Sequence, residues 1–429
     1  MADLNQMLKL LGELDDQIVG CMRCGMCQSV CPLFAETGRE SDVARGKIAL
    51  LEFLGHEMIK DTKAVKDRLD KCLLCGSCAA ACPSGVKAVD IFIKARAIIT
   101  AYIGLSPIKK AIFRGMLTKP ALFNTLLALG SKFQGFFTSP VNDIIGSSCS
   151  KLLSPLLGDR HLLSLADKPL RSIGNLNTAP GKSGIKVAFF YGCVVDKMFT
   201  SVGESILKVF EHHGVGVYMP TEQVCCGVPS LASGDLTSYQ DLVRMNLKVF
   251  GKGDFDYIIT PCGTCTSAFH HVWPLMNEGF SQAERDQIEM LAGKAMDINA
   301  FIVDKLGVTA VEPASDAAKV TVHDPCHLKK SLGVSGQVRT ALKANPNLQV
   351  VEMTGSDVCC GCGGSFNLQH YGVSTKIGKK KRDSIVATGA DIVAAGCPAC
   401  MMQIADMMSQ AGDRIAVKHP VELYAQTLR

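Results

Sequence analysis

The stretch CMRCGMCQSVCP, residues 21–32, places four cysteines within eleven positions and ends in proline. The same spacing, C-x2-C-x2-C-x3-C-P, returns at residues 72–83 as CLLCGSCAAACP. Loops of two residues let three thiolates converge on one four-iron cluster, while the fourth cysteine of each run reaches across to the second cluster. The spacing therefore predicts two clusters held close together, as an electron relay requires.

This crossing divides the eight cysteines into two ligand sets. The first set is Cys21, Cys24, Cys27 and Cys82, and the second set is Cys72, Cys75, Cys78 and Cys31. Two zinc sites are the alternative, but zinc favours separated C-x2-C pairs, which fit a single run of four cysteines poorly. Between the runs, VARGKIALLEFLGHEM has apolar residues at helical spacing. The predicted domain, residues 1–100, therefore resembles the helical two-cluster ferredoxin domain of respiratory iron–sulfur subunits.

The cysteine count, the N-terminal residues and the charge balance indicate which classes of protein fit this chain. The chain has 429 residues, 20 of them cysteine, and its N-terminus lacks the basic start and long apolar core of a signal peptide. We therefore expect a cytoplasmic protein whose thiols serve metal or redox chemistry rather than disulfides. The sequence contains no uncharged apolar stretch of about 18 residues, so we expect no transmembrane helix. A net charge of +5 from 45 basic and 40 acidic residues is too balanced to favour nucleic-acid binding.

Ten further cysteines form an internal repeat. A single cysteine, an adjacent pair followed by glycine, and a C-x2-C pair occur twice, at offsets of 133 to 135 residues. The first copy contains Cys193, Cys225, Cys226, Cys262 and Cys265, and the second contains Cys326, Cys359, Cys360, Cys397 and Cys400. Such a repeat indicates two copies of one domain, which we place at residues 185–308 and 309–429.

Short apolar runs carry these cysteines at their C-terminal ends. IKVAFFYGC, FDYIITPCGTC, KVTVHDPCH and ADIVAAGCPAC each stop at glycine or proline, and helical stretches such as VGESILKVFEHHG lie between them. The alternation of strands and helices predicts a doubly wound parallel α/β sheet in each copy. Ligands of such sheets gather beyond the carboxyl ends of the strands, so five thiols should meet at one edge of each domain.

The pattern C-x31-CC-G-x34-C-x2-C resembles the cysteine-rich CCG domain. That family includes subunits of heterodisulfide reductase and of anaerobic glycerol-3-phosphate dehydrogenase, and the iron–sulfur subunit of glycolate oxidase and related lactate dehydrogenases. Fusion of a two-cluster ferredoxin domain to two CCG domains is most similar to the last two. The resemblance implies one or two further, non-cubane four-iron clusters in the CCG domains. The alternative is that one copy holds an ordinary cluster, zinc or nothing, and serves as a docking domain.

The sequence shows no site for an organic cofactor, because it contains neither G-x-G-x-x-G after a strand nor a P-loop. Oxidation of a 2-hydroxy acid needs a flavin or a nicotinamide. The resemblance therefore implies a partner subunit with FAD, from which this chain passes electrons to a quinone or another carrier in a D-lactate or glycolate dehydrogenase. The alternatives are the membrane-linking subunit of anaerobic glycerol-3-phosphate dehydrogenase, a thiol–disulfide reductase of the heterodisulfide type, and a metal-binding scaffold or redox sensor. No catalytic residue is assigned.

Three features remain outside these sets. Residues 101–184 are expected to form an apolar and basic helical connector that ends in a linker, residues 175–184. The connector packs on the CCG domains or a partner subunit, or lies peripherally on the inner face of the cell membrane. His323 and His327 flank Cys326 and are expected to be hydrogen-bonded neighbours that tune a cluster rather than ligands. Cys149 is expected to be a buried apolar residue.

Overall fold

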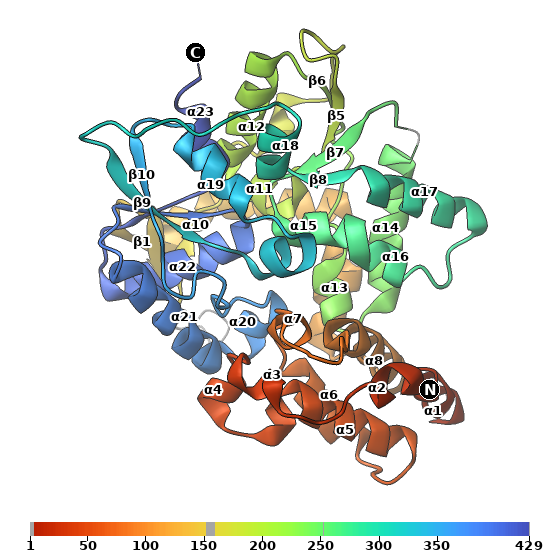
Figure 1. Cartoon of the computed structure of the whole chain (residues 1–429). Coiled ribbons are helices and arrows are strands. Elements are labelled where there is room, and N and C mark those ends of the chain that lie inside the picture. Colours follow the sequence, from red (N-terminus) through yellow and green to blue (C-terminus); the bar gives the residue numbers. More distant parts are fainter. Residues whose placement is uncertain (1–3, 152–158, 252, 429) are drawn as a thin grey trace. The chain divides into compact units, whose positions relative to one another are not determined.

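The computed structural model describes residues 4–151, 159–251 and 253–428 (Figure 1). The chain divides into two compact units. The first unit comprises residues 1–119, 227–242 and 361–377, and the second comprises residues 120–226, 243–360 and 378–429. Both short segments of the first unit begin directly after a Cys-Cys pair. The domain boundaries expected from the sequence remain predictions.

The first unit is helical. Its longest helices, α5 (Ala44–Gly55) and α8 (Ala88–Ile103), bury apolar side chains such as Leu51 and Ile91, and α1, α5 and α6 all pack against α8. The Asp61 carboxylate begins α6 by accepting a hydrogen bond from the Ala64 amide at 2.9 Å. The remaining helices up to residue 119 are α1 (Leu4–Gly12), α2 (Asp15–Val19), α3 (Met26–Ser29), α4 (Phe34–Thr37), η1 (Glu40–Asp42), α6 (Thr62–Asp70), α7 (Ser77–Ala80), α9 (Pro107–Lys110) and the π-helix η2 (Ala111–Leu117).

A five-stranded sheet forms the core of the first repeat copy. Its order is β4-β6-β5-β7-β8, with parallel neighbours except for the antiparallel pair β4 and β6. The strands are β4 (Leu176–Asn177), β5 (Lys186–Phe189), β6 (Gly216–Met219), β7 (Tyr257–Thr260) and β8 (Ala295–Asp297). The helices are α11 (Gly192–Lys197), α12 (Thr200–His213), α13 (Val228–Ala232), α14 (Leu236–Phe250), α15 (Gly263–Ser267), η4 (Ala268–Val272), α16 (Trp273–Leu275), α17 (Gln282–Lys294) and α18 (Ile298–Asp304).

A four-stranded parallel sheet forms the core of the second copy, in the order β10-β9-β11-β12. The strands are β9 (Ala318–His323), β10 (Leu348–Val351), β11 (Ile392–Ala395) and β12 (Ala416–Lys418). The helices are η5 (His327–Ser331), α19 (Gly336–Lys343), α20 (Ser365–Gln369), α21 (Tyr371–Val386), α22 (Pro398–Ala411) and α23 (Pro420–Ala425). The mixed helix and sheet architecture is thus confirmed, and its doubly wound character stays a prediction.

The two sheet-containing copies pack on each other within the second unit. Helix α12 of the first copy contacts α23 of the second, and α18 contacts α19. The Ser201 hydroxyl donates to Glu422 at 2.8 Å, and His213 and Tyr424 are linked at 2.9 Å. These helix contacts and hydrogen bonds join the first copy to the second.

The connector contains more strand than the sequence suggests. Helix α10 (Pro120–Phe137) follows η2 as expected, but β1 (Thr138–Asn142), β2 (Ser147–Ser150) and β3 (His161–Leu163) then form an antiparallel sheet that was not anticipated. Strand β4, which lies within the expected linker, pairs with β6 of the first repeat copy. A 3-10 turn, η3 (Leu170–Ile173), lies between β3 and β4. In the described part of the chain, no helix is both long and apolar enough to cross a membrane.

Candidate metal centres

Each N-terminal cysteine run folds into a tight loop that leads into a short helix. Gly25 and Gly76 have φ angles of 89° and 73° at the starts of α3 and α7. Arg23 and Leu74, one residue before the second cysteine of each run, also have positive φ angles of 55° and 52°. Left-handed backbone at such residues is uncommon and costs about 1 to 3 kcal/mol. The same strained turn in both runs is therefore typical of a loop shaped to hold a ligand.

The structure brings the second predicted set together. Cys31 of the first run lines one pocket with Cys72, Cys75 and Cys78 of the second run. Burial is the main cause that raises the pKa of the Cys31 thiol to about 11, and the charges of Cys72 and Cys75 add to it. The two runs are therefore interleaved at this pocket, as crossing requires.

The first predicted set lies nearer the surface. Cys24 is exposed, and Cys21, Cys27 and Cys82 are partly exposed. Burial raises the pKa of the Cys27 thiol, and the nearby charge of Cys21 contributes. Helix α3, which carries Cys27, packs against α7, which Cys82 follows. The helix of the second run therefore contacts the helix that carries Cys27.

Two buried cations stand beside the inner set. Burial lowers the pKa of Lys47, and the charge of Cys72 opposes this shift. The buried Arg96 guanidinium donates to the carbonyl oxygens of Cys72 at 2.8 Å and Ala232 at 2.7 Å. Positive charge in a low-dielectric setting stabilises added negative charge. Lys47 and Arg96 therefore favour negative charge in the inner pocket, and Arg45 acts in the same way, from a more exposed position, on Cys24 and Cys27 of the outer set.

The first repeat copy places its cysteines after the ends of its strands. Cys193 follows β5, the pair Cys225 and Cys226 follows β6, and Cys262 and Cys265 follow β7. The Cys193 side chain interacts with Cys225, which with burial raises the pKa of Cys193 well above its usual value. Cys265 interacts with both Cys226 and Cys262. The five thiols thus interact in two groups at the carboxyl edge of the sheet. One group is Cys193 with Cys225, and the other is Cys265 with Cys226 and Cys262.

The second copy repeats this placement. Cys326 follows β9, Cys359 and Cys360 follow β10, and Cys397 and Cys400 follow β11. Hydrogen bonds from Cys359 and Cys400 lower the pKa of Cys360 well below its usual value, against the effect of burial. Cys400 also interacts with Cys397. These interactions show that the sulfur atoms of Cys359, Cys360, Cys397 and Cys400 lie close together.

The glycine after each Cys-Cys pair has a conformational reason. Gly227 and Gly361 have φ angles of 89° and 90°, a region that side chains other than glycine rarely adopt. A Cβ atom at Gly227 would also come within 2.9 Å of Cδ2 of Tyr239. The turn directly follows the pair, whose two side chains interact with different thiols in the first copy: Cys225 with Cys193, and Cys226 with Cys265.

The two repeat copies meet at their C-x2-C pairs. The Sγ atoms of Cys262 and Cys397 lie 3.8 Å apart, and the Thr264 hydroxyl lies 3.8 Å from Sγ of Cys397. The amide of Gly263 donates to the Gly396 carbonyl at 3.4 Å. Sequence spacing predicted two separate sites and missed this meeting. The available signal was the glycine beside each C-x2-C pair, since small residues permit close approach of two backbones.

The two histidines that flank Cys326, and Cys149, lie in different surroundings. The Nδ1 atom of His327 lies 3.0 Å from the Thr264 hydroxyl, so His327 is a hydrogen-bonded neighbour, as expected. His323 is fully buried at the end of β9, close to Cys360 and Cys400. Cys149 on β2 is partly exposed rather than buried, which corrects the expectation.

The donor chemistry of these groups fits iron–sulfur clusters. All twenty cysteines are free thiols, and most of the repeat cysteines are buried. Thiolates are the ligands that iron–sulfur clusters prefer. Five sulfur donors in each copy exceed the four ligands of a structural zinc site. A buried group of thiols without disulfides is therefore best explained by a soft metal cluster.

Comparisons with known proteins agree with this chemistry. The model of the 4Fe-4S dicluster domain matches residues 17–86, and that of the cysteine-rich CCG domain matches residues 187–270 and 320–405. The probable glycolate oxidase iron-sulfur subunit of Bacillus subtilis is 28% identical over 404 residues, covering 91% of this chain and 89% of the relative. A fumarate reductase (CoM/CoB) subunit of Methanothermobacter marburgensis is 27% identical over 401 residues, covering 92% of this chain and 68% of the relative.

A third relative is more similar over a shorter span. Lactate utilization protein A of Bacillus cytotoxicus is 33% identical over 240 residues, covering 56% of this chain and 98% of the relative. The matched domains contain both cysteine systems described above. This chain therefore belongs to the family of iron–sulfur proteins with the cysteine-rich CCG domain that includes lactate utilization protein A and the glycolate oxidase iron-sulfur subunit.

Proposed function

We propose that this chain is the electron-transfer subunit of a flavin-dependent 2-hydroxy-acid dehydrogenase that oxidises D-lactate or glycolate. A partner subunit with FAD carries out the oxidation, and this chain passes the electrons singly to a quinone or another carrier. The observation that carries the proposal is the presence of two thiol systems in one chain: the interleaved N-terminal runs and the two facing CCG sets. The names of the glycolate oxidase and lactate utilization relatives support the substrate class.

The two N-terminal ligand sets hold cubane clusters in this proposal. Cys21, Cys24, Cys27 and Cys82 hold the outer cluster, and Cys72, Cys75, Cys78 and Cys31 hold the inner one. The pocket shared by Cys31 and the second run supports the crossing. The buried cations Lys47 and Arg96 favour the reduced state of the inner cluster, so electrons should reside there in preference to the outer set, whose neighbouring cation Arg45 is more exposed.

The ten repeat cysteines hold one or two further, non-cubane clusters. Their ligands are Cys193, Cys225, Cys226, Cys262 and Cys265 in the first copy, and Cys326, Cys359, Cys360, Cys397 and Cys400 in the second. Each domain is doubly wound in this proposal, with the first parallel strand of the copy in the middle. The positions of β5 between β6 and β7, and of β9 between β10 and β11, support this topology.

A second candidate function is reduction of a disulfide. The close approach of Cys262 and Cys397 favours it, because two cluster sites that face each other could deliver two electrons to one substrate bond. The relative named as a fumarate reductase (CoM/CoB) subunit also keeps this alternative open. Activity of the full chain on disulfides with a reduced dye would support it, and inertness would count against it.

The docking face in this proposal is helix α10. Leu122, Leu126, Leu129, Phe133 and Phe136 are 41% to 75% exposed on this helix. Five exposed apolar side chains on one helix are typical of an interaction surface. We assign the face to the FAD subunit, with peripheral contact to the inner face of the cell membrane as the alternative. The membrane alternative would also suit the subunit that links glycerol-3-phosphate oxidation to a quinone.

The deciding experiment is a visible spectrum of the native complex, purified without oxygen and then oxidised. D-lactate, glycolate or glycerol 3-phosphate is added, and dithionite follows as the control. Bleaching of the broad iron–sulfur absorbance by D-lactate or glycolate is the expected result, because a flavoprotein partner then feeds these clusters. Bleaching by glycerol 3-phosphate alone would favour the membrane-linking alternative. Bleaching by dithionite only would overturn the proposal and favour the disulfide reductase.

A further inference from the structure

His323 lies among the thiols of the second CCG set, and its Nδ1 atom has a clear partner. The residue ends β9 and is fully buried, and Nδ1 lies 3.1 Å from the carbonyl oxygen of Ser356. The same oxygen accepts hydrogen bonds from the Asp324 amide at 3.0 Å and from the Lys381 ammonium at 3.2 Å. A carbonyl oxygen can only accept, so Nδ1 carries the hydrogen.

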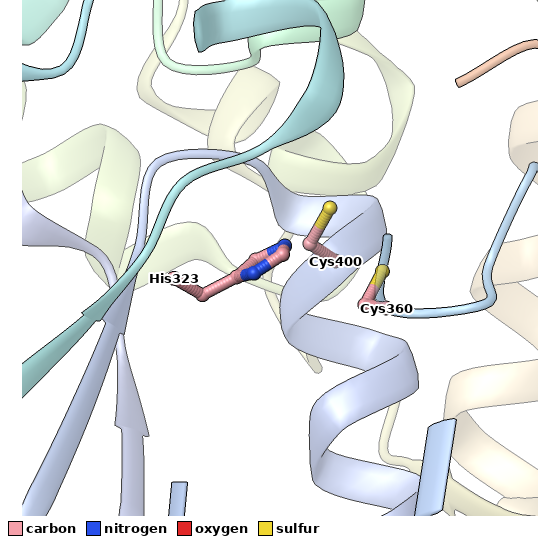
Figure 2. A group of neighbouring side chains, drawn as sticks. All are labelled: His323, Cys360 and Cys400. Carbon is pink, nitrogen blue, oxygen red and sulfur yellow. The ribbon is translucent and has the colours of Figure 1, made fainter. Parts of the chain in front are cut away.

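The other ring nitrogen is buried and lies near two sulfur atoms. The imidazole of His323 interacts with the Cys360 thiol and helps to lower its pKa, and Nε2 has no partner of ordinary hydrogen-bond geometry among the described residues. A ring nitrogen of His323 and the Sγ atoms of Cys360 and Cys400 all lie within 4.8 Å of one another. Figure 2 shows the imidazole at the end of the strand, beside the sulfur of Cys400 on its helix and that of Cys360 on its loop. A buried ring nitrogen beside two candidate ligand sulfurs needs an explanation.

Lys381 helps to hold the carbonyl group that orients the imidazole. Its ammonium group is buried, binds the same carbonyl oxygen as Nδ1, and also donates to the carbonyl of Gly355 at 2.6 Å. A neutral imidazole with hydrogen on Nδ1 leaves a lone pair on Nε2. A lone pair that faces two sulfur donors is stabilised when a metal ion lies between them.

The internal repeat provides a natural comparison. Phe190 stands three residues before Cys193, as His323 stands three residues before Cys326. Phe190 is fully buried and packs edge-on against Phe250 and Phe269, at 6.0 and 4.9 Å between ring centroids. The first site therefore offers no nitrogen at the position where the second site offers one.

We propose that Nε2 of His323 ligates an iron of the cluster in the second CCG site, so that the two sites have different donor sets. The inference rests on the proposed presence of a cluster in that site. It replaces the expectation from the sequence that His323 only tunes a cluster through a hydrogen bond. The second site then has an imidazole nitrogen beside its five thiols, whereas the first site has thiols alone.

The test uses the full chain labelled with 15N-histidine and purified without oxygen. Pulsed EPR is recorded in whichever redox state makes the CCG cluster paramagnetic, and Mössbauer spectra of 57Fe-enriched protein report the same site in any spin state. The expected result is a strong histidine 15N coupling in the wild type. The coupling disappears in His323→Phe, which reproduces Phe190 of the first copy, and persists in His327→Gln.

The outcomes separate this inference from the proposed function. Suppose that the second site contains iron, but that neither histidine coupling nor nitrogen-ligated iron in the Mössbauer spectrum is found. This result overturns the ligand role of His323 and leaves the proposed cluster in place. Absence of iron from the site, or zinc in its place, overturns both the ligand role and the proposed cluster there. The EPR signals of the N-terminal clusters report whether His323→Phe has folded. If it has not, persistence of the coupling in His327→Gln decides between the two histidines that flank Cys326.

Discussion

The thiols that share a site are separated in sequence, and Cys31 is the clearest case. It belongs to the first run but lines a pocket with three cysteines of the second. We predict that Cys31→Ala loses the inner cluster, with Cys72, Cys75 and Cys78 left behind, because a cubane needs about four thiolate ligands. Iron content should fall by about one cluster while the outer cluster and the CCG signals persist in EPR spectra.

The matched control for this change is Cys149→Ala. Cys149 lies on β2 within the small antiparallel sheet, outside every predicted ligand set. Its removal should leave the iron content and all EPR signals unchanged. Loss of the outer cluster in Cys31→Ala, instead of the inner one, would show that each run holds its own cluster without crossing.

A buried histidine predicts how stability depends on pH. Nε2 of His419 donates to the Pro261 carbonyl at 2.9 Å, and Nδ1 accepts from the Val421 amide at 3.2 Å. Burial lowers the pKa of His419 to about 4. Because this lies below the unfolded value of about 6.5, the stability contributed by His419 is complete above that pH and is lost as the pH falls toward 4, by up to about 1.4 kcal/mol per pH unit.

The measurement compares thermal unfolding of the wild type with that of His419→Gln. The wild type should melt at a higher temperature near pH 7.5, and the difference should shrink near pH 5. Acid loss of clusters affects both proteins, so it largely cancels in the difference. A difference that stays constant between these pH values would contradict the assigned protonation state.

Among the structural elements, the turn after each Cys-Cys pair controls the shape of its site. Gly227 has a φ angle of 89° and no room for a Cβ atom next to Tyr239. We predict that Gly227→Ala loses iron from the first CCG site, because Cys225 and Cys226 can then no longer both face the cluster. EPR spectra should show the N-terminal clusters unchanged.

The control for this turn is Gly293→Ala in helix α17. A Cβ atom at Gly293 meets nothing within 4 Å, and its helical backbone suits alanine. This change should retain all iron and raise stability by about 1 kcal/mol, measured by chemical denaturation. Equal iron contents in the two variants would refute the role assigned to the Gly227 turn.

For the whole molecule, the exposed face of α10 predicts assembly with a partner. We expect the double variant Leu126→Asp and Phe133→Asp to release the FAD subunit, because both side chains are exposed and apolar in this chain. Iron content should stay unchanged, since neither residue is near a predicted ligand in the sequence. Size-exclusion chromatography of the native complex reports the release. Retention of the FAD subunit together with loss of binding to anionic vesicles would instead assign the face to the membrane.

Much of this protein could be predicted from residue spacing, because cluster ligands obey local rules. The runs at residues 21–32 and 72–83 predict iron–sulfur ligands, and the repeat of ten cysteines predicts two similar sites at the ends of strands. The helical N-terminal region and the mixed helix and sheet copies follow from apolar periodicity. The antiparallel sheet of β1, β2 and β3 did not, because short polar strands such as TSPVN and SSCS have no alternating pattern to detect.

Contacts between distant residues depend on packing, which spacing cannot encode. Sequence alone established which thiols exist and how each copy orders them, but not that Cys262 of one copy would lie 3.8 Å from Cys397 of the other. It also ranked His323 and His327 equally, because both flank Cys326. They differ in the folded chain: the Thr264 hydroxyl is the partner of His327, whereas the imidazole of His323 is fully buried beside Cys360 and Cys400. That difference arises from how the strands and helices of the two copies bring their edges together.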